Sequence, residues 1–182
     1  MRIGKGFNLP LKEIECSNCG TKIMKRVCES INLSEDSKSL KEIMGGKFNF
    51  SNCPKCKTKI DHKSHVLLSY VDPPRWIWLV SKKYQHPQYL QNFFTEVLPE
   101  SSSSLIQQEM VFVEFGEPCE CLQFVIDGKQ PQSSLDWLKL GKMYTGDKAI
   151  DCFKNALRMD GSIYEAKKLM HEEMDKLKSY SL

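Results

Sequence analysis

The 182-residue sequence has no apolar run approaching the ~20 residues that a bilayer-spanning helix requires. Near its start it also lacks the continuous apolar stretch of ~7 to 15 residues that is typical of a secretory leader. We therefore expect a cytoplasmic protein without a membrane partner. Three catalytic signatures are missing too: a glycine-rich phosphate loop, an H-E-x-x-H motif, and a nucleophile with a histidine nearby in sequence. These absences predict a protein that is not an enzyme and has no evident small-molecule substrate.

Charge is plentiful but unevenly distributed. Residues 1–87 carry 16 Lys and Arg against 8 Asp and Glu, whereas residues 88–182 carry 10 against 15. The net charge of +3 therefore combines a basic half with an acidic half. We expect the two halves to face different surroundings.

Four of the eight cysteines form two C-x-x-C pairs, Cys16 with Cys19 and Cys53 with Cys56. A tight turn across each pair brings two sulfurs to one metal, and tetrahedral Cys₄ coordination leaves no open position. The pattern predicts one structural Zn²⁺ that cannot activate a water. Iron held by the same thiolates is one alternative. A redox dithiol needs only one pair, and a disulfide framework is disfavoured in a reducing cytosol.

The remaining cysteines have weaker signals. Cys28 and Cys152 stand among apolar neighbours and are interpreted as packing groups. Cys119 and Cys121 form a C-x-C pair at a predicted turn, which leaves a second metal open, although no further pair or histidine is close in sequence.

Two histidines, His62 and His65, follow the second cysteine pair. Their spacing does not fit a Cys₂His₂ zinc finger, which has about 12 residues before the first histidine and three to five between the two. We interpret both as surface or core residues.

Hydrophobic periodicity predicts short strands around the cysteine pairs with one helix between them, over residues 36–44, ended by Gly45-Gly46. Alternation over residues 60–70 and the apolar run 76–80 predict two antiparallel strands joined at Asp72-Pro-Pro. Further along, the pattern predicts a helix at 87–98, strands at 110–115 and 122–126, and a linker after Asp127-Gly128. Everything beyond residue 131 is helical in pattern, with breaks at 145–147 and 160–161.

The stretch from Cys16 to Tyr84 resembles the CpXC family. The likeness includes Glu29-Ser-Ile-Asn32, Gly46 and Phe48-x-Phe50 leading into the second cysteine pair. The first pair lacks the proline that many members carry, which leaves the ligands intact. The resemblance implies a prokaryotic zinc-ribbon domain over residues 1–130, with the four paired cysteines as ligands, and it implies no activity.

The C-terminal part resembles one tetratricopeptide (TPR) repeat. Trp137, Leu140, Gly141 and Tyr144 match W-x-x-L-G-x-x-Y, and an A-x-x-x-F-x-x-A segment centred on Phe153 follows. The gap between the two segments is about four residues shorter than the family pattern, and Gly161 replaces the usual proline. A helix at 163–177 would act as a cap. One repeat cannot bury its own apolar face, so it either packs on the N-terminal domain or receives a partner.

Together these features predict an α+β protein. The first domain, 1–130, is a zinc ribbon with small antiparallel sheets and inserted helices (ribbon about 10–86, helix 87–98, strands 109–127). The second, 131–182, is a TPR-like helical hairpin with a capping helix.

The predicted function is a non-catalytic adaptor that holds protein partners, with Trp137, Tyr144 and Phe153 as candidate partner-binding residues. The alternative is a nucleic-acid-binding regulator, because basic residues surround the cysteine pairs and Arg75, Trp76 and Trp78 follow. An enzyme would need residues far apart in sequence, such as Asp61, His62, His86 and Glu114, to assemble a pocket. The basic residues near the cysteine pairs are Lys22, Lys25, Arg26, Lys55, Lys57, Lys59 and Lys63.

Overall fold

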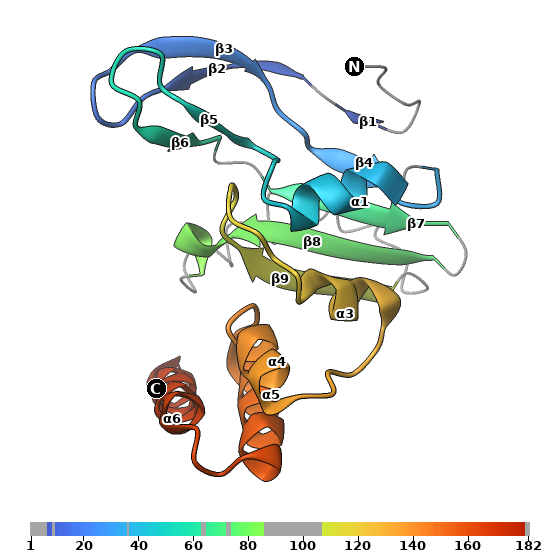
Figure 1. Cartoon of the computed structure of the whole chain (residues 1–182). Helices are drawn as coiled ribbons and strands as arrows, with labels where there is room; N and C mark the ends of the chain where they lie inside the picture. The colour runs from blue at the N-terminus through green and yellow to red at the C-terminus, as the bar shows by residue number, and fades with distance from the viewer. Residues whose placement is uncertain are drawn as a thin grey trace. The chain divides into compact units, whose positions relative to one another are not determined.

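A computed structural model describes residues 7–8, 10–35, 37–62, 65–71, 74–85 and 107–180. The chain forms two compact units, Met1–Cys119 and Glu120–Leu182, whose elements are labelled in Figure 1. The sequence pattern instead predicts a boundary near residue 131. The predicted helix at 87–98, together with His86 and Lys63, lies outside the described residues. Within the described part of the chain, no helix has the length and apolar character needed to cross a membrane.

The main sheet of the first unit has five strands in the order β1-β4-β7-β8-β9. The pairs β1–β4 and β7–β8 are antiparallel, whereas β4–β7 and β8–β9 are parallel. The sheet is therefore mixed, which corrects the prediction of antiparallel sheets alone. Parallel pairs join strands that are distant in sequence, so strand periodicity does not reveal them. The five strands are Phe7–Asn8, Ser30–Asn32, Val66–Tyr70, Arg75–Ser81 and Gln107–Val113, and a 3₁₀ turn at Lys82–Tyr84 follows β8.

The apolar run at 76–80 forms the central part of β8, as predicted. Ile77 and Leu79 are fully buried on one face of the sheet, while Trp78 and Val80 pack with Phe112 on the other. A strand buried on both faces needs apolar residues at every position, which explains the continuous run. The predicted antiparallel pairing with the preceding strand is confirmed, with Val66 opposite Leu79.

Two small antiparallel hairpins complete the strands of the first unit. One pairs β2 (Leu11–Glu15) with β3 (Lys22–Arg26), and the other pairs β5 (Phe50–Asn52) with β6 (Lys59–Asp61). The alternation predicted over 60–70 thus belongs to two strands, β6 and β7, in different sheets. These hairpins confirm the predicted short strands around the cysteine pairs.

The predicted helix between the cysteine pairs is present as α1, Ser37–Met44. Its end has the expected glycine: Gly46 has φ of +69°, and its N–H donates to the carbonyl of Ile43. The N–H of Lys47 donates to the carbonyl of Glu42, so the last turn is closed by a Schellman-type pair of bonds.

The segment 122–126, predicted as a strand, is instead the helix α3, Leu122–Asp127. Its buried residues are Leu122, Val125 and Ile126, which are spaced as one face of a helix. Gly128 has φ of +64° and ends the helix in the left-handed conformation that glycine favours. The prediction was wrong because a short apolar run does not distinguish a strand from a buried helix.

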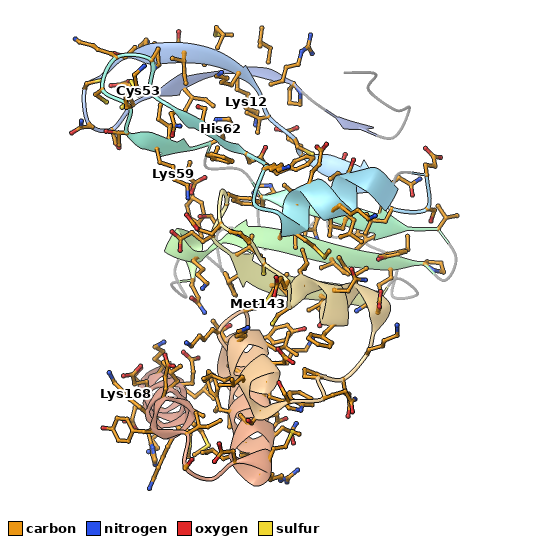
Figure 2. The ribbon with its side chains drawn as sticks, in the orientation of Figure 1. Lys12, Cys53, Lys59, His62, Met143 and Lys168 are labelled. Atoms are coloured by element: carbon orange, nitrogen blue, oxygen red, sulfur yellow. The ribbon has the colours of Figure 1, made fainter. Side chains whose placement is uncertain are left out.

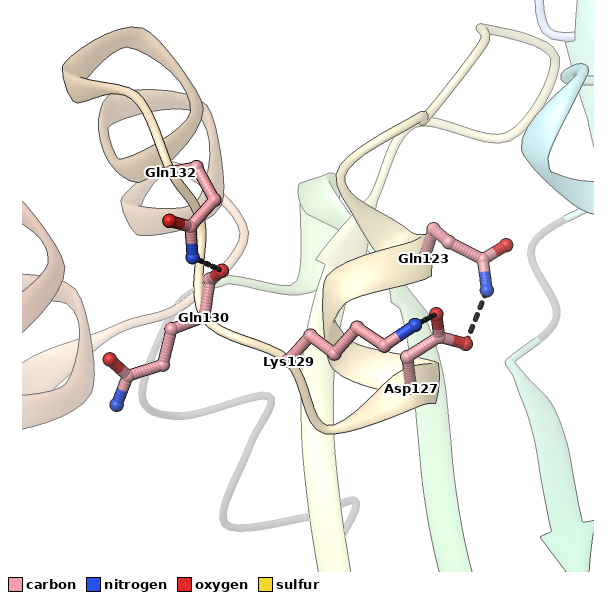
Figure 3. A network of polar contacts seen from close by, with 5 residues as sticks. All are labelled: Gln123, Asp127, Lys129, Gln130 and Gln132. Atoms are coloured by element: carbon pink, nitrogen blue, oxygen red, sulfur yellow. Dashed lines mark hydrogen bonds and ion pairs between the residues drawn. The ribbon is translucent and has the colours of Figure 1, made fainter.

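Polar contacts surround the end of α3, as Figure 3 shows. The carboxylate of Asp127 pairs with Lys129 at 3.0 Å and accepts a hydrogen bond from the Gln123 amide. Lys129, and then Gln123, hold the pKa of Asp127 below its usual value. Farther along, the Gln132 amide donates to the carbonyl of Gln130 at 3.1 Å. The predicted linker therefore has a hydrogen bond of its own.

Three helices follow in the second unit: α4 (Ser134–Gly141), α5 (Gly146–Met159) and α6 (Tyr164–Tyr180). Ser133 caps α4, because its hydroxyl accepts from the Asp136 N–H at 3.1 Å. The predicted helical pattern and the break at 160–161 are confirmed, whereas the first break covers residues 142–145, because Gly146 already begins α5. α5 packs against α4 and also against α6.

A close approach between α4 and α5 depends on Gly141. A Cβ at this position would lie 2.4 Å from Cε1 of Phe153, so the ring occupies the space that a side chain would need. At the other contact, the buried carboxylate of Glu173 in α6 accepts from the N–H of Gly146 at 3.0 Å, which supplies negative charge at the start of α5.

The Gly141–Phe153 contact predicts that Gly141→Ala destabilises the second unit. Alanine improves helix propensity by up to about 1 kcal/mol, but overpacking of this kind costs about 1–3 kcal/mol. We expect a net loss measured by urea unfolding of the whole chain, followed by helical circular dichroism. Gly161→Ala is the matched control, because its Cβ would meet no atom closer than 3.8 Å. Equal unfolding midpoints for the two variants would contradict this account.

Candidate metal centre

The two cysteine pairs belong to a repeated segment, C-x-x-C-x-Thr-Lys-Ile, at residues 16–23 and 53–60. Each copy forms the turn of one hairpin, the first between β2 and β3 and the second between β5 and β6. Figure 2 labels Cys53 and Lys59 in the second copy. The two hairpins therefore bring equivalent turns to a shared site.

The backbone of the two turns has the same hydrogen bonds. The N–H of Cys16 donates to the carbonyl of Thr21 at 3.0 Å, and the N–H of Cys53 donates to that of Thr58 at 2.9 Å. The residue after the second cysteine takes positive φ in both copies, +69° at Gly20 and +62° at Lys57. This conformation turns the chain back so that both sulfurs of a pair face the other hairpin.

The four cysteine sulfurs lie within 4.8 Å of one another. Cys16 Sγ is 3.6 Å from Cys56 Sγ, and Cys19 Sγ is 3.5 Å from Cys53 Sγ. A tetrahedral ion with Zn–S bonds of about 2.3 Å spaces its sulfurs about 3.8 Å apart. The arrangement therefore fits a four-coordinate metal ion with thiolate ligands. Among the described residues, this is the one such group of three or more His, Cys, Asp or Glu side chains.

One side of the cluster is buried and the other is accessible. Cys16 and Cys53 are buried in a core that includes Ile14, Val27 and Ile60, whereas Cys19 and Cys56 are partly exposed. The apolar side contains residues of both hairpins in one small core, and the accessible side gives a metal ion a path into the site.

Both partly exposed sulfurs contact a threonine hydroxyl. Cys19 Sγ is 3.2 Å from Thr21 Oγ1, and Cys56 Sγ is 3.2 Å from Thr58 Oγ1. The Thr21 hydroxyl and its N–H lower the pKa of Cys19. The Thr58 hydroxyl, the Asn18 side chain and the Thr58 N–H lower the pKa of Cys56 to about 5. These donors favour the thiolate form that binds metals.

The pKa of Cys16 is raised, in contrast to those of Cys19 and Cys56. The N–H of Asn18 lowers its pKa, but burial and the neighbouring thiols of Cys56 and Cys19 outweigh that contact and raise the pKa to about 11. Several negative sulfurs this close repel one another. The cluster therefore favours a cation, which neutralises part of the charge.

The second hairpin is joined to the segment after β9 by side-chain contacts. Lys59 pairs with Glu117 at 2.5 Å and lies 5.6 Å from the centre of the Phe50 ring. Gly116 has φ of +89°, and a Cβ there would lie 2.8 Å from the Phe50 ring and 2.5 Å from Lys59. This close packing positions the cysteines of the second pair relative to the main sheet.

The two histidines near the cluster lie outside it. Nε2 of His62 is 3.1 Å from Ser51 Oγ, and the ring of His65 packs edge-on against Trp78. Burial lowers the pKa of both histidines. His62 is buried and His65 is half-buried, and neither belongs to the metal-competent group.

Cys28 and Cys152 are buried, as predicted for packing groups. Burial is the main cause that raises the pKa of Cys28, to about 12. Cys119 and Cys121 precede α3 and do not belong to any group of three or more metal-competent side chains among the described residues.

Of the residues considered for an enzyme pocket, those that the structure describes come from neighbouring strand ends, because Ser81, which contacts Asp61, pairs with Val113 beside Glu114. Asp61 accepts a hydrogen bond from the Ser81 hydroxyl at 2.9 Å, and Glu114 is exposed after β9.

The basic residues named for nucleic-acid binding are partly committed to other contacts. Lys22 pairs with Glu13 at 2.9 Å, and Lys59 pairs with Glu117. Lys57 donates to the carbonyl of Pro54 at 3.2 Å, within its own turn. Lys25, Arg26 and Lys55 are exposed.

The aromatic residues that follow the cysteine pairs are not displayed together. Arg75 pairs with Glu109 at 2.7 Å, Trp78 is buried and Trp76 is half-buried. Among the described candidates, the basic side chains near the cysteine pairs are therefore exposed, whereas neither tryptophan is fully exposed.

In the second unit, two of the three candidate partner-binding residues are buried. Phe153 packs against Gly141, and Tyr144 is 8% exposed. Trp137 is half-buried. A partner would reach Trp137 more readily than the other two.

Sequence reasoning missed Asn18, Thr21 and Thr58. The Asn18 amide donates to Thr58 Oγ1 at 3.2 Å and so connects the two turns. The two threonines had a visible signal, since both copies of the repeat place threonine two residues after the second cysteine.

Two hairpin turns that converge on four cysteines above a mixed sheet define a protein of the zinc-ribbon-like class. The chain belongs to the CpXC family: the family model described as CpXC protein matches residues 14–114, more than half of the chain. The match spans both cysteine pairs and β9, whereas the helices of the second unit lie beyond it. No curated protein and no solved structure matches the chain significantly.

The geometry predicts one metal ion per chain. We expect metal analysis of the protein, purified without added metal, to give a molar ratio near one, and Cys53→Ser to lower it toward zero because a ligand is lost. Cys119→Ser is the control and should keep the ion. A ratio near two in the parent, falling to one in Cys119→Ser, would show that the C-x-C pair binds a second metal.

Proposed function

We propose that this chain is a non-catalytic interaction protein in which one structural zinc ion stabilises the first unit. The observation that supports this best is the closed set of four cysteines. A zinc ion held by four protein sulfurs has no position for a substrate or water, so it contributes to folding instead of chemistry. The buried core around Cys16 and Cys53 is consistent with that role.

Zinc is favoured over iron by the chemistry of the site. Tetrahedral sulfur sites hold either metal, and zinc is the usual choice where the ion only joins short hairpins. The two hairpins bury little apolar surface, with Ile14, Val27 and Ile60 as the main buried residues beside the sulfurs. Metal binding then supplies folding free energy that the small core lacks.

The metal identity can be tested directly. We expect elemental analysis of protein from the native host to find zinc, and the purified protein to be colourless. Removal of the ion by a chelator at neutral pH should unfold the two hairpins, because the bonds between the ion and the four sulfurs no longer contribute folding free energy. Amide hydrogen exchange of β2–β3 and β5–β6 measures this, with α5 as an internal reference. A red protein with visible absorption would identify iron and refute zinc.

The interaction role is supported by exposed apolar side chains in the second unit. Tyr164 is 78% exposed, Leu135 is 59% exposed and Met159 is 53% exposed. Met159 ends α5 and Tyr164 begins α6, so both flank one turn. The α4–α5 pair, with Gly141 against Phe153, is consistent with the TPR-like interpretation, and α6 would be its capping helix.

Binding of a protein partner should therefore depend on the side chains that flank the turn between α5 and α6. We expect the tagged full-length chain to recover one protein from the native host in near-stoichiometric amount, and Tyr164→Ala combined with Met159→Ala to lose it. Lys154→Ala combined with Lys178→Ala is the control, because both lysines are exposed and only pair locally. Recovery of no stoichiometric protein would refute the adaptor role. Nuclease-sensitive recovery of nucleic acid would favour the alternative regulator.

A further inference from the structure

The two threonine hydroxyls contact the two sulfurs that solvent can reach. Cys19 and Cys56 are partly exposed, and each lies 3.2 Å from the hydroxyl of Thr21 or Thr58. The buried sulfurs of Cys16 and Cys53 have no such partner among the described residues. Because a metal-bound thiolate has no proton, the hydroxyl must be the donor in both contacts.

The two contacts are not equivalent. The Asn18 amide donates to Thr58 Oγ1 at 3.2 Å, so the single hydrogen of that hydroxyl is left for the Cys56 sulfur. In the repeat, Lys55 occupies the place of Asn18. Among the described residues no side chain orients the Thr21 hydroxyl in the same way.

A hydrogen bond to a metal-bound sulfur has two effects. It draws negative charge away from the sulfur, which makes the sulfur a weaker nucleophile. It also fixes the ligand in place, and loss of such outer contacts commonly lowers metal affinity about 10- to 100-fold. An oriented hydroxyl therefore protects its sulfur better than one that is free to rotate.

We propose that Thr21, Thr58 and Asn18 are positioning residues that protect the two accessible thiolates unequally, so that Cys19 is the sulfur at which the metal centre opens to electrophiles. This inference rests on the metal centre proposed above. With an alkylating agent such as iodoacetamide, the Cys19 sulfur forms a bond to carbon and iodide leaves. The resulting thioether carries no charge and would be a much weaker ligand, so a bound ion would be lost more readily from the three remaining sulfurs.

The first test maps alkylation in the zinc-loaded full-length protein. Iodoacetamide is added below one equivalent, modified peptides are quantified by mass spectrometry, and released zinc is followed with a chromogenic chelator. We expect Cys19 to react before Cys56. Thr58→Val should raise the rate at Cys56 about tenfold. Thr21→Val should raise the rate at Cys19 by a smaller factor, because no described side chain orients the hydroxyl that it removes. The Thr→Ser variants, which keep the hydroxyl, should restore the parent rates.

The second test exchanges the side chains at positions 18 and 55, which differ between the two turns. Asn18 and Lys55 are both exposed, so substitutions there leave the buried core intact. Lys55→Asn should slow the reaction at Cys19, Asn18→Lys should speed it at Cys56, and the double variant should reverse the order. The Asn18 and Lys55 variants test the order in which Cys19 and Cys56 react, even where a threonine variant folds poorly.

A spectrum separates hydrogen bonding from a general structural effect. With Co²⁺ in place of zinc, removal of the Thr21 or Thr58 hydroxyl should shift the sulfur-to-metal charge-transfer band to lower energy, because the sulfur becomes a better electron donor. An unchanged order in the double variant, or first reaction at Cys16 or Cys53, would overturn the inference. A parent protein that binds no metal would instead refute the proposed function.

Discussion

The two hairpins of the first unit bring four cysteine sulfurs within 4.8 Å of one another. The stability of the hairpins depends on how the negative charge of these sulfurs is neutralised. Without a cation these groups cannot all be charged, as the raised pKa of Cys16, about 11, indicates. In the proposed site, a divalent ion would replace the repulsion among these groups with four bonds to sulfur and would so connect the two hairpins. The apolar residues around the buried sulfurs are too few to hold the hairpins together alone.

The centre is connected to the rest of the first unit through the second hairpin. Phe50 and Lys59 lie on its two strands, and Gly116 packs on both from the segment after β9. The ion pair between Lys59 and Glu117 covers the same contact. A lysine that the sequence suggests for phosphate binding thus positions the metal centre, which weakens the case for a nucleic-acid surface there.

Sequence patterns identified the features that short-range chemistry determines. The two cysteine pairs, α1 with its glycine stop, and the β7–β8 pairing follow from spacing and periodicity along a short stretch of chain. The parallel pairs β4–β7 and β8–β9 involve distant segments, so periodicity could not reveal them. Residues 122–126 are predicted as a strand but belong to α3, in which Leu122, Val125 and Ile126 are buried on one helix face. Gly128 does not distinguish the two, because glycine can end a helix or form a turn between strands. Asn18 was missed because its contact crosses between hairpins.

The repeated segment explains why the two turns have equivalent cysteine and threonine contacts. It also shows where the two turns differ. Equivalent turns place Thr21 and Thr58 beside the partly exposed sulfurs. Asn18 donates to Thr58 in the opposite turn, whereas the second copy of the repeat has Lys55 at the same position. A site that only had to stabilise the fold would gain nothing from unequal sulfurs, because all four bonds contribute to the same closed structure. Unequal protection matters only when the centre meets a reagent or a competing ligand. Under the inference made above, the asymmetry would decide which sulfur of a closed structural site such a reagent reaches first.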